Sequence, residues 1–137
     1  MNQSKNSNRG TTVPTSEEFV KTLGQVTWLM TQSKSHRDSE ISLIEAHVVA
    51  PLMFKQVRVY SKSKQPLAAI IWAYVSKDRK EILSKDGYRM VLEDWRSGSE
   101  IMIVDCISPF IDSTPFIENF MAEIAEIKKR NSLGQEE

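Results

Sequence analysis

The sequence predicts one mixed α/β (α+β) domain in which helices flank a mostly antiparallel sheet. Segments with apolar residues at helical spacing stand near both ends of the chain. Two strand-like runs, 56–60 and 67–75, are joined by the turn-rich segment SKSKQP, which predicts a hairpin. A third run, EIMIVDCISPF at 100–110, is apolar on both faces and predicts a central strand that is covered from both sides.

The first helix should begin behind Thr15, because Thr15 and Glu18 have the spacing of a capping box. Apolar residues then recur at helical spacing: Phe19, Val20, Leu23, Val26 and Met30. The following stretch TQSKSHRDS, residues 31–39, contains no apolar residue and predicts a loop.

A second helix is expected over residues 40–54, capped by Asp38 or Ser39. One of its faces carries Ile41, Ile44, Val48 and Leu52. Pro51 has no backbone N–H to donate and should kink or end this helix.

Residues 78–96 contain a short helical period, which predicts a helix from Tyr88 to Trp95. Pro109 ends the third strand, and Thr114 with Pro115 opens a last helix with an apolar stripe from Phe116 to Ile127. No internal repeat is present. We therefore expect a flexible polar tail at 1–14, a single domain at 15–130 and a frayed tail at 131–137.

The composition excludes several classes of protein. Lys plus Arg number 18, as do Asp plus Glu, so a general affinity for nucleic acid is not expected. The single cysteine, Cys106, cannot form an internal disulfide and points to a reducing compartment. No apolar run suits a signal peptide or a membrane span, so a soluble cytoplasmic protein is expected. Two histidines and one cysteine, all scattered, predict no metal site.

Asp105 stands out in the third strand. Strict alternation would place it on one face with Ile101, Ile103 and Ile107, and would turn Cys106 to the other face. A carboxylate among isoleucines needs a partner. A loop cap, an arginine such as Arg96, or a protonated histidine could each supply one. Cys106 is most simply a small core residue, and the opposite-face argument separates it from Asp105.

His36 follows Ser33 by three residues in the predicted loop. A histidine near its ordinary pKa is a good general base, and an aspartate can hold its tautomer. Ser33 would then be a nucleophile or a hydrogen-bonding group. The alternative is an exposed histidine without a role, since Ser-x-x-His is a common pattern. His47 lies in a helix beside apolar residues, which favours a hydrogen-bonded structural histidine.

Six pieces in order resemble one family: LGQVTWL at 23–29, SKSHR at 33–37, the helix with Pro51, IIWAYV at 70–75, EDWRSG at 93–98 and VDCISPF at 104–110. Together they cover about residues 19–120. On these pieces the chain resembles the RTX toxin-activating lysine acyltransferases.

The resemblance implies a fold similar to the GNAT acetyltransferases. Family members move a fatty acyl group from acyl carrier protein to internal lysines of a protoxin, in the cytoplasm before secretion. The family's functional histidine, aspartate and serine fall on His36, Asp105 and Ser33. Members usually continue beyond the last helix with further strand and tail segments, so a partner such as a second copy of the chain could complete the sheet.

In the expected mechanism His36 takes the proton of the attacking lysine, Asp105 orients His36, and transfer is direct. Trp28, Trp72 and Trp95 are candidates to line an apolar slot for the acyl chain. Lys34, Arg37 and Arg96 are candidates to meet the acidic surface of acyl carrier protein, the donor; no bound cofactor is expected. Two further hypotheses are a non-catalytic escort for a secreted polypeptide or acyl carrier protein, and a thiol hydrolase that uses Cys106.

Overall fold

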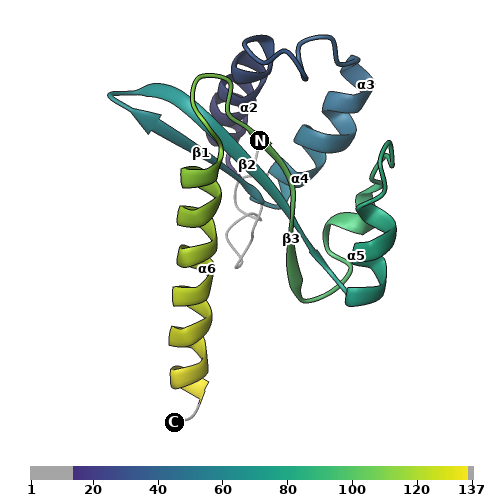
Figure 1. The fold of residues 1–137 in the computed structure, drawn as a ribbon, viewed down its shortest axis with the longest axis vertical. Coiled ribbons are helices and arrows are strands. Elements are labelled where there is room, and N and C mark those ends of the chain that lie inside the picture. Colours follow the sequence, from purple (N-terminus) through teal and green to yellow (C-terminus); the bar gives the residue numbers. More distant parts are fainter. Residues whose placement is uncertain (1–13, 136–137) are drawn as a thin grey trace, which may run out of the picture.

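The computed structural model describes residues 14–135 and confirms the mixed α/β class (Figure 1). Its helical elements before the sheet are α2 (Ser16–Thr31), α3 (Ile41–Ile44), the π-helix η1 (Glu45–Val49) and α4 (Ala50–Met53). The remaining elements are β1 (Val57–Lys62), β2 (Gln65–Val75), α5 (Lys77–Leu83), the 3-10 helix η2 (Leu92–Trp95), β3 (Glu100–Ile107) and α6 (Thr114–Gln135). The predicted tail at 1–14 lies almost wholly outside the described residues.

Within the described residues the sheet has the order β1-β2-β3, with both neighbouring pairs antiparallel. The prediction that the third strand is central is wrong, because β2 occupies the centre and β3 the edge. The pattern misled because apolar residues on both faces report what covers a strand, not how many strands pair with it. A mixed α/β fold with an antiparallel sheet is consistent with the GNAT-like fold that the resemblance implies.

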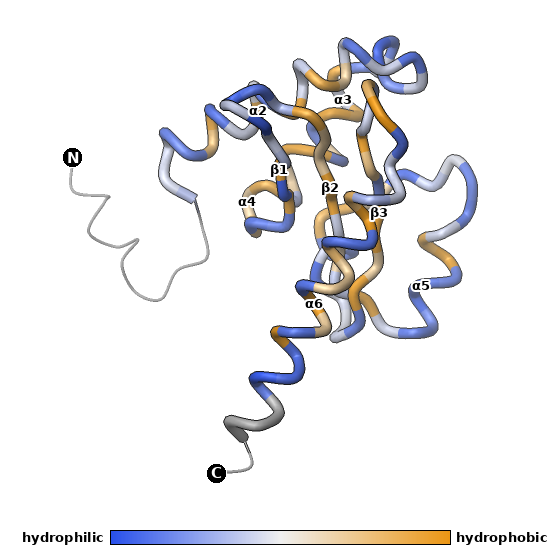
Figure 2. The backbone as a smooth tube through the Cα atoms, turned by 60° about the vertical axis from the view of Figure 1, so that its left-hand side comes forward, coloured by the Kyte–Doolittle hydropathy of each residue, from blue (hydrophilic) through white to orange (hydrophobic). Residues whose placement is uncertain are grey.

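Two apolar clusters cover the sheet, one on each face. The larger joins the sheet to α2, η1 and α5, and includes Leu29, Val48, Ile71 and Trp95. The smaller lies between the sheet and the first half of α6, around Trp72 and Phe120. Figure 2 shows apolar residues along β2 and β3 and mostly polar ones along the far half of α6. That far half runs beyond the sheet and continues to Gln135, past the predicted domain boundary (Figure 1).

The predicted hairpin is confirmed, with a tighter turn than the six-residue SKSKQP suggested. Lys62 pairs with Gln65, so only Ser63 and Lys64 form the loop. Their φ angles are 51° and 71°. Positive φ at both central residues is the geometry of a type I′ turn, whose twist matches that of paired strands.

The first predicted cap is confirmed and the second is wrong. The Glu18 backbone N–H donates to Thr15 Oγ1 over 3.1 Å, and the Thr15 N–H donates to Glu18 Oε1 over 3.0 Å. The second helical segment instead begins behind Glu40, which makes no side-chain cap. In η1 the Ala50 N–H donates to the Glu45 carbonyl, five residues back, directly before Pro51. The helix ends at Met53, soon after Pro51, as predicted.

The helix predicted from Tyr88 to Trp95 is wrong. The α-helix lies earlier, at Lys77–Leu83, and only the 3-10 turn Leu92–Trp95 falls in the predicted range. A buried carboxylate holds the intervening segment: Asp94 accepts bonds from the Tyr88 hydroxyl over 2.8 Å and the Val91 N–H over 2.9 Å. Arg79 of α5 donates to the same carboxylate. These bonds favour an irregular path over a continuous helix.

Candidate active site

A β-bulge in β3 decides where Asp105 points. Ile71 of β2 lies opposite Asp105, but the next residue, Trp72, lies opposite Ile103, so Val104 has no partner. One extra residue reverses the alternation of side chains beyond it. Asp105 therefore shares a face with Ile71 and the helices α2 and η1, rather than with Ile103 and α6.

The bulge corrects the predicted faces of the strand. Ile101 and Ile103 pack against α6, whereas Ile107 packs with Asp105's side of the sheet. Cys106 lies on the opposite face from Asp105, as predicted, in the cluster under α6. Burial raises the pKa of the Cys106 thiol, which favours the unreactive protonated form. The thiol-hydrolase hypothesis loses support from both observations.

Ser33 and His36 come together in the turn that follows α2. The Ser33 carbonyl accepts the N–H groups of His36 over 3.1 Å and of Arg37 over 2.9 Å, which closes the turn. The Ser33 hydroxyl lies 2.6 Å from His36 Nδ1, and the Ser35 hydroxyl lies 3.1 Å from the same nitrogen. The two hydroxyls are 3.3 Å apart. Sequence reasoning missed Ser35, although its position beside His36 in a polar loop could have suggested it.

The other ring nitrogen of the histidine reaches β3. His36 Nε2 lies 2.8 Å from Asp105 Oδ2, across 69 residues of sequence. A carboxylate only accepts, so Nε2 carries a proton and the neutral ring presents a lone pair at Nδ1. The side chains of His36 and Asp105 are 17% and 39% exposed, and Ser33 is 8% exposed. Ser33, His36 and Asp105 thus form one hydrogen-bonded line at the edge of the core.

Asp105 also sets the charge of this site. Its hydrogen bond, followed by its negative charge, raises the pKa of His36, while partial burial of the ring opposes that shift. The arrangement can accept a proton at Nδ1 and stabilise the imidazolium that forms. This is the chemistry of a general base held in one tautomer by a carboxylate.

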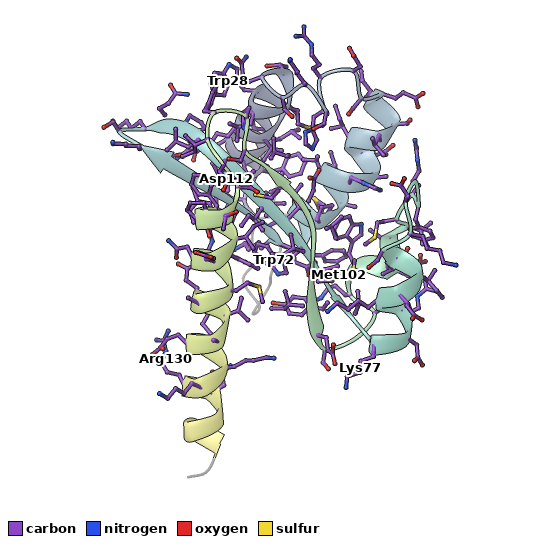
Figure 3. The ribbon with its side chains drawn as sticks, viewed as in Figure 1. Trp28, Trp72, Lys77, Met102, Asp112 and Arg130 are labelled. Carbon is purple, nitrogen blue, oxygen red and sulfur yellow. The ribbon has the colours of Figure 1, made fainter. Side chains whose placement is uncertain are left out.

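The three tryptophans occupy different environments. Trp95 is fully buried, and Trp72 is 8% exposed and packs against Phe120 of α6 at 4.8 Å. Trp28 is 39% exposed and its ring lies 5.8 Å from that of Phe110, which follows β3. Figure 3 shows Trp28 at one end of the molecule and Trp72 between the sheet and α6. The structure therefore separates them, and their predicted role in an acyl slot stays a prediction.

The three candidate cations also divide into two groups. Lys34 and Arg37 are exposed on the turn that carries His36. Arg96 lies at the end of β2, bridged to Tyr74, with its guanidinium 5.6 Å above the ring of Phe54. The structure thus places only Lys34 and Arg37 on the loop of the candidate base.

His47 is a hydrogen-bonded structural histidine, as predicted. The Met90 backbone N–H donates to His47 Nε2 over 3.0 Å, and the Trp95 ring lies edge-on to the imidazole. Burial is the largest influence on the His47 pKa and lowers it, so the neutral form is favoured. Because Nε2 accepts a bond, its tautomer is fixed with the proton on Nδ1.

The described residues, 14–135, contain neither a metal-ligand cluster nor a membrane-spanning helix. In this part of the chain no group of three His, Cys, Asp or Glu side chains is placed to hold a metal ion. No described helix combines the length and the apolar character needed to cross a bilayer.

Comparison with known proteins identifies the family. The model of the RTX toxin acyltransferase family matches residues 15–135. The RTX-II toxin-activating lysine-acyltransferase ApxIIC of Actinobacillus pleuropneumoniae is 32% identical over 92 residues, 67% of this chain and 58% of that protein. The protein-lysine myristoyltransferase RtxC of Kingella kingae is 31% identical over 66% of this chain and 54% of its own.

The protein-lysine myristoyltransferase HlyC of Escherichia coli is likewise 31% identical, over 69% of this chain and 55% of its own length. The chain thus spans little more than half the length of these curated relatives. The family model, in contrast, covers nearly all of the described residues. The chain belongs to the RTX toxin acyltransferase family.

Proposed function

We propose that this protein is a protein-lysine fatty acyltransferase. It moves an acyl chain from acyl carrier protein to an internal lysine of a secreted, toxin-like protein, in the cytoplasm. The observation that supports this best is the hydrogen-bonded line of Ser33, His36 and Asp105. Membership of the family supplies the reaction class.

The reaction converts a thioester and a lysine amine into an amide and a free thiol. A free lysine has a pKa of about 10.4 and is almost wholly protonated at neutral pH. The lysine ammonium first loses one proton to solvent. As the neutral amine then attacks, its nitrogen gives a second proton to His36 Nδ1, which at rest bonds to the Ser33 hydroxyl. Asp105 stabilises the imidazolium through Nε2. The C–S bond breaks as the C–N bond forms, and the imidazolium returns the proton to the leaving thiolate.

Transfer is direct in this proposal, and Ser33 orients the base. Ser33 is also placed as a nucleophile would be, at 2.6 Å from the lone pair of His36 Nδ1. A transient acyl-serine is therefore the mechanistic alternative. Mass analysis of the protein mixed with donor alone distinguishes the two routes, since only the second adds an acyl group to Ser33.

Acyl carrier protein is the proposed donor because its acidic surface complements Lys34 and Arg37 beside the base. Arg96 lies apart from this loop, beside Tyr74 and Phe54. Coenzyme A enzymes commonly hold pyrophosphate with a glycine-rich turn at a helix N-terminus. The five glycines of this chain stand far apart in the sequence, which disfavours such a turn.

A non-catalytic escort is the second candidate function. An escort for a secreted polypeptide or for acyl carrier protein needs neither His36 nor Asp105. The Ser33–His36–Asp105 line favours the enzyme.

The test is the intact mass of the secreted candidate substrate, co-expressed with this protein or with variants. We expect a fatty acyl increment with the wild type and with Asp38→Ala, an exposed carboxylate in the same loop. His36→Ala should give none while keeping the wild-type melting temperature within a few degrees. An increment that persists with His36→Ala excludes the general-base role. Binding of the substrate without any increment from the wild type favours the escort.

A further inference from the structure

Two cavities share Met90 among their lining residues. The first, of about 320 Å³, lies between β3 and the segment after α5, and Asp105, Met102 and His47 line it. The second, of about 580 Å³, lies between the 42–53 helical segment and residues 89–92. Met90 is a lining residue of both. Figure 3 shows Met102 on the side of β3 that faces α5, where the first cavity lies.

The two cavities differ in the chemical character of the residues that line them. Asp105 and polar residues of the segment 84–88 line the first cavity. The second is lined mainly by apolar side chains: Ala46, Val49, Ala50, Met53, Val91 and Leu92. Val91 and Leu92 are 53% and 58% exposed. Exposed apolar side chains that line a concave groove mark a binding site more often than a bare surface.

Met90 is 3% exposed and belongs to the larger apolar cluster. Its backbone N–H donates to His47 Nε2, so a chain that passes from one cavity to the other has to displace its flexible thioether side chain. His47 is held neutral by burial and adds no charge beside the path. The residue that the two cavities share is therefore apolar, with a flexible side chain.

We propose that the acyl chain of the donor runs from the thioester at His36, past Asp105 and Met90, into the groove formed by Val49, Met53, Val91 and Leu92. This inference rests on the proposed function and adds the location of the chain and the residues that select its length. An apolar chain fits here because one end of the path adjoins the partner of the base and the other end is apolar. The exposed Trp28–Phe110 pair lines neither cavity and is the competing location.

The experiment measures turnover with acyl carrier protein loaded with a four-carbon or a fourteen-carbon chain. Leu92→Asp places a charge in the groove at an exposed position that tolerates it. Because each buried methylene contributes to binding, we expect this variant to lose about tenfold or more with the long chain and less than about twofold with the short chain. Met90→Trp, which blocks the junction, should shift the preference in the same direction.

The matched control is Ile111→Asp, an equally exposed residue beside Phe110 that lines neither cavity. It should affect both chain lengths alike. A chain-length-selective loss in Ile111→Asp, or an equal loss on both chains in a folded Leu92→Asp, overturns the proposed path. If the wild type acylates with neither chain, the proposed acyltransferase function is itself refuted. Failure of the proposed function can therefore be told apart from failure of the proposed acyl-chain path.

Discussion

Replacing Asp105 by Asn tests the central contact of the site. The change keeps the shape and removes the charge that His36 Nε2 meets at 2.8 Å. The hydrogen bond to Asp105 is the largest cause of the raised His36 pKa, and its charge acts in the same direction. With both weakened, burial of the ring dominates, so the His36 pKa should fall.

The effect on stability depends on pH. A histidine whose pKa is raised by folding stabilises the protein fully below its unfolded pKa, about 6.5, and this contribution is lost as pH rises through the folded value. A hydrogen bond to a charged group contributes about 1.5–3 kcal/mol. Since Asp105 is 39% exposed, solvent screening reduces this to about 1 kcal/mol. Asp105→Asn should therefore lose about 1 kcal/mol below pH 6 and less at high pH.

The effect on catalysis should be larger, because the amide no longer fixes the tautomer or stabilises the imidazolium. General-base catalysis contributes about 10²–10⁴-fold, so we expect turnover to fall by about 100-fold or more. The acid limb of the pH–rate profile should also move to lower pH, following the His36 pKa. The assays are an NMR titration of the His36 ring, urea unfolding at two pH values, and turnover. An unchanged His36 titration in the folded variant would show that the two side chains do not meet in solution.

Three further outcomes are expected. Cys106→Ala should leave turnover almost unchanged and lower stability by about 1–2 kcal/mol in urea unfolding, because a small cavity forms under α6; a folded but inactive variant would restore the thiol hypothesis. Asp94→Ala should lower stability by about 2–3 kcal/mol, since it strips the Tyr88 hydroxyl and the Val91 N–H of their acceptor, and an unchanged unfolding midpoint would contradict this. Turnover should be faster with acyl-acyl carrier protein than with acyl-CoA, and turnover with acyl carrier protein should fall as the salt concentration rises. Equal turnover with both donors, unaffected by salt, would exclude electrostatic attraction of the donor by Lys34 and Arg37.

The sequence by itself determined the features that depend on neighbouring residues. The Thr15–Glu18 capping box and the hairpin at 61–66 were predictable because each is specified by side chains a few positions apart. The sequence also predicted that Asp105 needs a hydrogen-bonding or charged partner, because burying an unpaired carboxylate in an apolar strand costs free energy wherever the strand lies. The family resemblance then selected His36 among the possible partners.

Only the tertiary structure decided the place of β3 at the edge of the sheet and the face on which the Asp105 side chain lies. Coverage of both faces leaves the same pattern in a central and an edge strand, so the sequence could not distinguish them. The bulge at Val104 depends on register with β2, and one unpaired residue leaves no mark on composition. Asp94 likewise overrode a local helical period through bonds to Arg79 and Tyr88. In each case the deciding energy comes from contacts between segments distant in sequence, which local patterns do not record.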